Sequence, residues 1–453
     1  MSAVVTEQNI YAAQFSSMRG RLPGNHLPWL ERLRQKGMDD FLALGFPTTK
    51  LENWKYTNVA PIRRIAFEPA QDRPLTPLTG TLEIVSSASP RLVFVNGWFS
   101  PTLSSINSGL NFHLLNMGQA LQDPDRAGVI KRHLGRYTGT SDHAFAAWNT
   151  AFFTDGAYIE IPRGKALEQP IHFTFISADD GKPRASYPRN LIVAGEGSQV
   201  TVVESFLGFD DSAYLTNTVT EIAAGPGAVV DYYKVECESP QGFHVAAIDA
   251  HLERDASLTS HSISFGGGLV RNDLNVALDG EGAHCTLNGL FAVDGQRLVD
   301  NHTRIEHMRP HASSRELYKG VLAGNAEGVF NGAIVVRENA QKTDAVQYSK
   351  NLLLSRNAQI NTKPQLEIRN NDVRCFHGAT IGQMDADAIF YLKSRGIDEV
   401  EASRILVRGF GGEIIDAIRV PTLRDQLEHL LGRWVSGVAC GDGGPDANKT
   451  EAS

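Results

Sequence analysis

Cysteine is scarce in this chain. Only four occur among 453 residues, and no two of them form a C-x-x-C pair. This spacing excludes the common zinc knuckles and the thioredoxin-like redox site, which both need paired cysteines. No charged segment followed by an apolar core opens the sequence, so we predict no secretory signal and a cytoplasmic protein with reduced thiols. The four are Cys237, Cys285, Cys375 and Cys440.

Several motifs that would make the chain a self-contained enzyme are also missing. The sequence has no G-x-x-x-x-G-K-[ST] loop, no G-x-S-x-G elbow, and no G-x-G-x-x-G that opens a helix after a strand. These absences exclude a P-loop ATPase, an α/β-hydrolase and a dinucleotide-binding domain. No run approaches the roughly 18 apolar residues of a membrane-spanning helix. A formal charge of −8 without a basic block argues against a general nucleic-acid binder. With these classes of enzyme and binding protein excluded, the sequence favours a scaffold protein.

The length of the chain allows two or three domains of ordinary size. Residues 1–150 predict a helical or mixed N-terminal domain. Within it, apolar residues recur at helical spacing from Leu30 to Leu44, after a proline that suits a first helical turn. The segment HAFAAWNTAFF (143–153) predicts a short buried helix.

A weak repeat begins near residue 156, where short strand-like runs follow one another and similar turns precede them. The second residues of these turns are Gly197, Gly227, Ala256, Gly282, His311, Ala326, Ala340, Ala358 and Asp372. Up to His311 the spacing is nearly constant, and after it the spacing falls to about half. Similar turns therefore occur once per coil in the first part of the repeat and twice per coil in the second. Such a pattern is typical of a β-solenoid. A sandwich or barrel would also give short strands, but without fixed spacing. We predict a β-helix core over residues 151–383.

Helical patterns return after the repeat, over residues 384–437. Two short helical segments would cap the open end of the solenoid or offer a ridge to a partner. One helix carries Ile405, Phe410 and Ile414, and the next has a leucine-rich stripe. The polar residues 438–453 are predicted to be a disordered tail.

The most reactive pair of side chains lies where the repeat meets these helices. Cys375 and His377 are two residues apart, so on a strand they share one face, with Arg374 and Phe376 on the other. A thiolate could bind iron or hold sulfur, and an imidazole could bind a metal or move a proton. The alternative is a buried cysteine beside a structural histidine.

Other candidate residues favour structural roles. The histidines of HTRIEHMRPH (302–311) do not match H-E-x-x-H, and their spacing favours structural or solvent-exposed roles. A β-helix polysaccharide hydrolase or lyase would need clustered carboxylates. Four acidic residues could contribute to such a site, but none forms a tight Asp-Asp or Asp-x-Asp cluster. They are Asp294, Asp300, Glu306 and Asp344.

Several of these stretches together resemble a known family. They are PTTKLENWKYTNVAPI (47–62), the run from 243 to 274, and DVRCFHGATIGQMDADAIFYLKSRGI (372–397), which is the most specific. From about residue 46 to 435 the chain is similar to the SufB/SufD family of the SUF iron–sulfur cluster assembly system. The pattern NDVRCFHGATIGQ is similar to the SufD side of that family. Phe376 departs from it, because a small residue is common there.

The resemblance implies a mostly β fold, with a right-handed parallel β-helix core flanked by α-helical N- and C-terminal domains. It implies a non-catalytic scaffold subunit that pairs with SufB and binds the ATPase SufC through its C-terminal helices. Ile405, Phe410 and Ile414 are the candidates for that contact. His377, and less firmly Cys375, would lie at the SufB interface and contribute to iron acquisition and nascent cluster formation.

By the same resemblance, no cofactor would be tightly bound by this chain alone. Iron or a transient iron–sulfur cluster would be shared with SufB, and the chain in isolation could form a homodimer. Two alternatives remain open at this point: a SufB-like homomeric scaffold and, less favoured, the β-helix polysaccharide enzyme.

Overall fold

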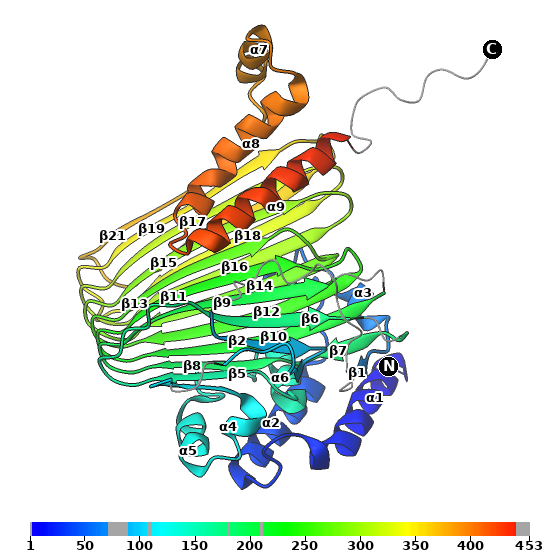
Figure 1. The fold of residues 1–453 in the computed structure, drawn as a ribbon, viewed down its shortest axis with the longest axis vertical. Coiled ribbons are helices and arrows are strands. Elements are labelled where there is room, and N and C mark those ends of the chain that lie inside the picture. The colour runs from blue at the N-terminus through cyan, green and yellow to red at the C-terminus, as the bar shows by residue number, and fades with distance from the viewer. Residues whose placement is uncertain (1, 71–88, 107–109, 179–180, 209–211, 441–453) are drawn as a thin grey trace, which may run out of the picture.

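The computed structural model describes residues 2–70, 89–106, 110–178, 181–208 and 212–440. In this part of the chain, a sheet of eleven strands and a sheet of ten form the two sides of one β-solenoid (Figure 1). All neighbouring strands from β6 (Ile171–Ser177) to β21 (Arg374–Gln383) pair in parallel. The prediction of a mostly β protein with a parallel solenoid core is confirmed.

The chain alternates between the two sheets. The first sheet contains β1 (Glu68–Pro69), β4 (His113–Asn116), β5 (Ala157–Ile161), β7 (Arg184–Ser186), β8 (Arg189–Ala194), β10 (Tyr214–Ala224), β12 (Gly242–Leu252), β14 (Leu269–Leu278), β16 (Leu298–His307), β18 (Glu327–Val336) and β20 (Gln359–Ile368). The second sheet contains β2 (Arg91–Val95), β3 (Trp98–Phe99), β6, β9 (Gln199–Gly208), β11 (Val229–Cys237), β13 (Ser257–Ser264), β15 (His284–Val293), β17 (Ser313–Leu322), β19 (Asp344–Leu353) and β21.

The length of one coil explains the two spacings seen in the sequence. One coil separates the starts of successive strands in the second sheet, and this separation matches the longer spacing of the turns. The turns in the first half of the repeat all precede strands of the second sheet. From Asn325 onward, similar turns precede strands of both sheets in alternation, which halves the apparent period.

One corner of the solenoid is held by a ladder of left-handed residues. Asp255, His311 and Lys342 have φ of 57°, 60° and 62°, and Gly227 takes the same conformation earlier in the ladder. The backbone N–H of each donates to a carbonyl in the next coil, for example from His311 to Gln341 over 2.9 Å. These bonds offset the cost of a left-handed backbone at residues other than glycine.

The lumen between the sheets is packed mainly with apolar side chains, but it also buries a charged network. The Lys234 ammonium is 2.9 Å from His244 Nε2 and 2.9 Å from Asn272 Oδ1, and it also contacts Glu236. Burial alone would raise the pKa of Glu236, but Lys234 and His244 together bring it to about 2. Each charge in this network is therefore compensated by a neighbour, as burial of ions requires.

The N-terminal part of the chain is built on helices and shares both sheets with the solenoid. Its helices and 3₁₀ turns are α1 (Ser2–Met18), η1 (Arg19–Arg21), α2 (Pro28–Leu44), η2 (Glu52–Trp54), α3 (Ala60–Arg63), α4 (Met117–Ala120), α5 (Pro124–His133) and α6 (Ala144–Phe152). The two predicted helices are confirmed as α2 and α6, and every residue of α6 is buried. Strands β2, β3 and β4 join the solenoid sheets, so residue 150 does not separate two independent sheets.

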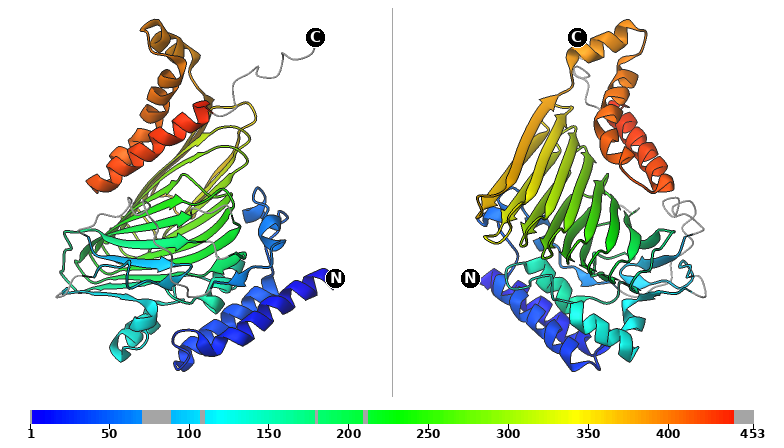
Figure 2. Two further views of the ribbon diagram at one scale, coloured as in Figure 1. Left: turned by 45° about the vertical axis from the view of Figure 1, so that its right-hand side comes forward. Right: turned by 90° about the vertical axis from the view of Figure 1, so that its left-hand side faces the viewer.

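The C-terminal helices do not cap the solenoid as predicted. These are α7 (Ala386–Ser394), α8 (Glu399–Asp416) and α9 (Pro421–Cys440). Helices α8 and α9 pack along the outer side of the second sheet (Figure 2). There Val407 and Leu427 belong to the same buried apolar cluster as Tyr233 and Leu290. Among the described residues, no helix covers the end formed by β20 and β21. The reason is that the apolar face of these helices matches the apolar outer side of the sheet.

Helix α9 continues to Cys440, beyond the boundary expected at residue 437. The rest of the predicted tail, residues 441–453, lies outside the described residues. None of the described helices has the length and apolar character needed to cross a membrane.

The close crossing of α2 and α6 gives a prediction for stability. A Cβ at Gly37 would lie 2.8 Å from the backbone oxygen of Ala147. We expect Gly37→Ala to lower the free energy of unfolding by about 1–3 kcal/mol, because the helices would have to separate. The matched control is Gly128→Ala in α5, where an added Cβ meets no atom within 4 Å. Urea unfolding of both variants tests this, and equal midpoints for the two would contradict it.

Candidate functional site

Strand β21 places Cys375 and His377 on the lumen side of the last coil. Cys375 is in register with Ala345 and His377 with Gln347, both fully buried residues of β19. Phe376 points to the outside and is 60% exposed. The predicted sharing of one face by the thiol and the imidazole is thus confirmed by the register.

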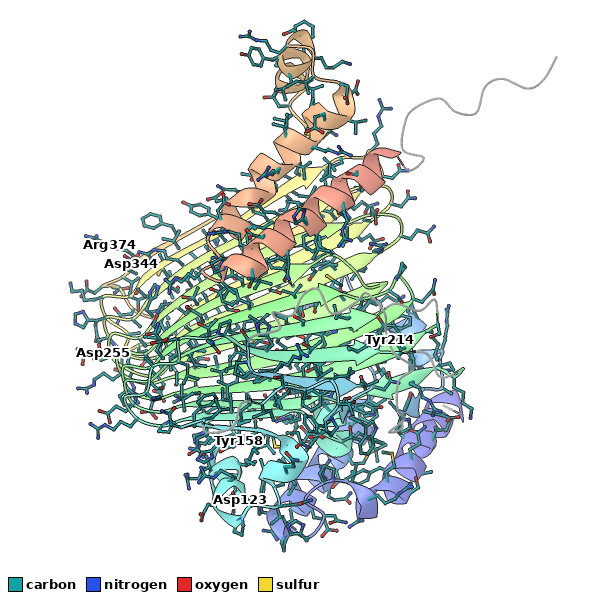
Figure 3. The ribbon with its side chains drawn as sticks, in the orientation of Figure 1. Asp123, Tyr158, Tyr214, Asp255, Asp344 and Arg374 are labelled. Atoms are coloured by element: carbon teal, nitrogen blue, oxygen red, sulfur yellow. The ribbon has the colours of Figure 1, made fainter. Side chains whose placement is uncertain are left out.

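These residues are accessible because the solenoid ends here. Strands β20 and β21 are the terminal strands of the first and second sheets. Nearly all their side chains are exposed or half-buried, including those on the lumen side, whereas the equivalent residues of β18 are mostly buried. Arg374 and Asp344 are in register at the edge of the last coils, on the same side of the molecule as Asp255 (Figure 3). We refer to this uncovered surface of β20 and β21 as the open end.

The environment of Cys375 disfavours the thiolate form of its side chain. Burial raises the pKa of the Cys375 thiol, and the Asp344 carboxylate raises it further, although a hydrogen bond involving the Ala345 backbone acts in the opposite direction. A cysteine becomes a good nucleophile or metal ligand only as the thiolate. A nearby cation or metal would favour the thiolate of Cys375.

A polar column lies beneath His377 in the lumen. Below His377 come Gln347 and then Glu316, one from each earlier coil of the second sheet. The Gln347 amide donates from Nε2 to Glu316 Oε2 over 2.6 Å. Burial raises the pKa of Glu316 to about 7, and the Thr303 hydroxyl and the Gln347 amide limit the rise. The sequence analysis did not identify Gln347 and Glu316, because the longer spacing of the turns places them near His377 but does not fix which residues come into register.

The three residues predicted to contact an ATPase do not form one exposed stripe. Ile414 is buried at 1% exposure in the core between α8 and the second sheet. Phe410 is partly buried, with the Lys319 ammonium 4.8 Å from the centre of its ring. Only Ile405 is exposed, at 41%. The accessible apolar side chains near it are instead Phe390, Tyr391 and Val400 of α7 and α8.

The acidic residues that a polysaccharide-acting site would need are paired with cations. Asp300 Oδ2 lies 2.6 Å from Arg271 Nη1, and Asp300 Oδ1 lies 3.0 Å from His302 Nε2. Asp344 pairs with Arg315 at 2.9 Å, Asp294 pairs with Arg297, and Glu306 pairs with Arg337. A glycosidase needs two carboxyl groups facing one bond, and these four residues are divided among separate ion pairs.

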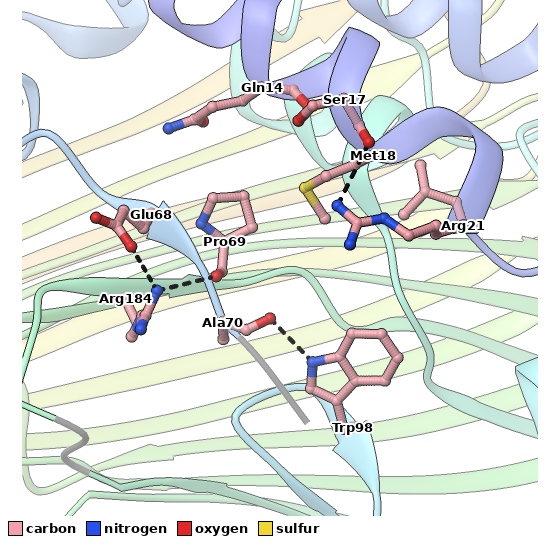
Figure 4. Close-up of a pocket in the computed structure, with 10 residues that line it drawn as sticks. Gln14, Ser17, Met18, Arg21, Glu68, Pro69, Ala70, Trp98 and Arg184 are labelled. Atoms are coloured by element: carbon pink, nitrogen blue, oxygen red, sulfur yellow. Dashed lines mark hydrogen bonds and ion pairs between the residues drawn. The ribbon is translucent and has the colours of Figure 1, made fainter. Parts of the chain in front are cut away.

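Two hollows lie outside the lumen, and the larger one reaches Gln365 and Glu367 of β20. A polar groove of about 820 Å³ follows the outer side of the first sheet between Trp54 and Tyr137. There Arg271 stacks over Trp54 at 4.4 Å and His143 contacts Asp273 at 3.1 Å, so the groups link the N-terminal segment to the solenoid. A second pocket, of about 520 Å³, lies between α1, Trp98 and the ion pair of Arg184 with Glu68 (Figure 4).

Comparison with known proteins identifies relatives along nearly the whole chain. A family model described as "SUF system FeS cluster assembly, SufBD core domain" matches residues 175–410, and one described as "SufBD protein N-terminal region" matches 5–173. The chain is 31% identical to the iron–sulfur cluster assembly protein SufD of Escherichia coli, over 89% of this chain and 93% of the relative. It is 31% identical to a SufBD family protein of Synechocystis, over 88% and 90%. It is 24% identical to SufD of Bacillus subtilis, over 90% and 94%.

The environment of Cys375 gives a prediction for its reactivity. We expect Asp344→Asn to lower the pKa of the Cys375 thiol, because it removes a nearby negative charge, and so to speed alkylation at a fixed pH. Labelling with iodoacetamide, followed by peptide mass spectrometry, measures the rate at this one cysteine. Asp372→Asn is the control, since Asp372 pairs with Lys342 on the neighbouring turn. Equal rates for the Asp344 variant and the unmodified protein would show that the carboxylate has no such effect.

Proposed function

This chain belongs to the SufBD family of iron–sulfur cluster assembly proteins, and we propose that it acts as a SufD-type scaffold subunit of the SUF complex. The observation that carries the proposal is the open end of the solenoid, where His377 is displayed on a terminal coil that nothing in the described chain covers. In this role the chain itself catalyses no reaction. It holds one part of a site that a second subunit completes.

The open end supports pairing with SufB. A terminal strand offers unpaired backbone N–H and C=O groups, which other proteins usually protect against association. Here the edges of β20 and β21 carry exposed apolar side chains as well. Ile368 is 42%, Phe376 60% and Ile381 51% exposed. A partner with a similar solenoid end would satisfy these edges and bury this apolar surface, and a second copy of this chain could do so in the absence of SufB.

Iron or a nascent iron–sulfur cluster is the cargo of this interface. Imidazole nitrogen is a common ligand of iron, and His377 presents its ring on the exposed lumen side. Cys375 lies on the same face, two residues away, and could contribute once a cation lowers the pKa of its thiol. Among the described residues, no group of three or more His, Cys, Asp or Glu side chains could hold a metal ion. The remaining ligands would come from SufB.

The C-terminal helices support binding of the ATPase SufC. The chain has no P-loop, so any work from ATP must come from a partner. Helix α7 projects away from the solenoid with Phe390 73% and Tyr391 56% exposed, and Ile405 lies on the neighbouring helix. Movement of these helices would be transmitted to the second sheet through α8, because Lys319 of β17 donates to the Phe410 carbonyl over 2.7 Å and pairs with Glu413. This is coupling between two sites rather than catalysis by this chain.

His377 is the residue to test first. We expect His377→Ala to leave assembly of the complex with SufB and SufC intact, because its side chain supports no packing in the solenoid. Cluster formation on the complex should fall at least about 10-fold, the usual minimum cost of removing a group that binds or orients a metal. Iron and sulfide content after reconstitution measures this. The control is His26→Ala, an exposed histidine in the N-terminal part. Normal cluster formation in the His377 variant would remove this residue from the site.

The ATPase contact can be separated from helix packing. We expect Phe390→Asp and Ile405→Asp to weaken capture of SufC while leaving the melting temperature unchanged, because both side chains are exposed. Ile414→Asp should instead lower the melting temperature, because it places a charge in the core beneath α8. Pull-down and thermal unfolding of the three variants measure both effects. If SufC is captured as well by both exposed-residue variants as by the unmodified chain, the contact lies elsewhere.

A further inference from the structure

The polar column under His377 is unusual because it is buried at one end and open at the other. Glu316 is 3% exposed and Gln347 is fully buried, whereas His377, in the next layer, is exposed. Strands in register are about 4.8 Å apart, so each side chain lies directly over the one below it. The imidazole of His377 is therefore the next polar group above the Gln347 amide.

The orientation of the Gln347 amide is fixed from two sides. Its Nε2 donates to Glu316 Oε2 over 2.6 Å, which sets the nitrogen on that side. The amide also reaches across the lumen to β18, where a Cβ at Gly332 would come within 2.3 Å of Nε2. Only glycine leaves room for it there.

One atom of this arrangement has no partner. Gln347 Oε1 is buried, and no donor among the described residues reaches it. A buried acceptor left without a hydrogen bond costs about 1–3 kcal/mol, so such an atom calls for an explanation. The coil below is occupied by Glu316, and the position in register above is His377. An imidazole N–H is the donor that this position offers.

We propose that Gln347 is a positioning residue for His377: its Oε1 accepts one ring N–H of the imidazole, and Glu316 holds the amide in place. The other ring nitrogen is then bare and faces the open end. This inference rests on the proposed role of His377 as a ligand at the subunit interface. A histidine that binds a metal commonly donates its second N–H to a carbonyl or carboxylate, which fixes the tautomer and makes the ligand more basic.

The test is the tautomer of His377 in the full-length chain alone, without iron or partners. Nitrogen-15 NMR of histidine-labelled protein at about pH 8.5, where an ordinary imidazole is neutral, distinguishes a protonated from a bare ring nitrogen. Loss of a signal in His377→Asn assigns the resonance. We expect the tautomer ratio of His377 to shift about 2- to 10-fold in Gln347→Met, as loss of one net hydrogen bond implies.

Two further variants separate positioning from a general effect on folding. Ser349→Ala removes a buried polar group of the same strand in the neighbouring column and should leave the ratio unchanged. The exchange variant E316Q/Q347E restores an acceptor under His377 and should restore the original preference. The proposal is overturned if Gln347→Met leaves the ratio unchanged, or if Ser349→Ala shifts it equally.

In the complex with SufB and SufC, Gln347→Met should slow cluster formation about 10- to 100-fold, the usual effect of removing a group behind a metal ligand. The role of His377 at the interface and the role of Gln347 can each be refuted without refuting the other. A shifted tautomer together with normal cluster formation in His377→Ala would refute the role of His377 and leave the hydrogen bond standing. An unchanged tautomer with impaired cluster formation in His377→Ala would refute the role of Gln347 alone.

Discussion

The in-register ladder of backbone hydrogen bonds between successive coils is the interaction on which this structure depends. Each coil satisfies the edge of the coil before it, so only the two ends of the solenoid remain to be covered. At the N-terminal end, antiparallel pairs of β2 with β3 and β4 with β5 terminate the sheets. At the C-terminal end the helices pack on the side instead. An unprotected strand edge can pair with other chains, and a second subunit that covered it would prevent such pairing.

The ladder also decides which residues meet. Side chains one coil apart become neighbours in a column, and that is how three coils contribute His377, Gln347 and Glu316 to one feature. The coil length and the shared face of Cys375 and His377 could be predicted from the sequence, because both follow from local periodicity. The column could not, because the coils differ in length from one to the next. A slip by a single position moves a side chain to the opposite face of the strand.

The C-terminal helices show a second limit of local patterns. Helical spacing correctly grouped apolar residues on α8, but it could not decide which of them face the sheet and which face outward. Ile414 lies in the core against Leu290 and Val321, whereas Ile405 is exposed. The choice depends on the outer side of the second sheet, built by strands that come much earlier in the chain. The pairing of Asp300 with Arg271 was likewise not visible from the sequence, because the two residues lie on strands of successive coils that come into register only in the fold. This ion pair removes Asp300 as a candidate acid.

The two residues of the original pair have different physical settings, and this decides their roles. Cys375 lies near the corner, packed with Val336 and Ala345, and the Asp344 carboxylate opposes loss of its proton. His377 lies two residues further into the open end, in register with the buried Gln347 amide, which in turn donates to Glu316. Under the proposed function, the imidazole would be oriented toward the partner by its own chain, whereas the thiol would rely on positive charge from the partner or its metal. Under the proposed function, this chain would therefore supply one half of the site, and His377 would be the residue whose orientation its own chain sets.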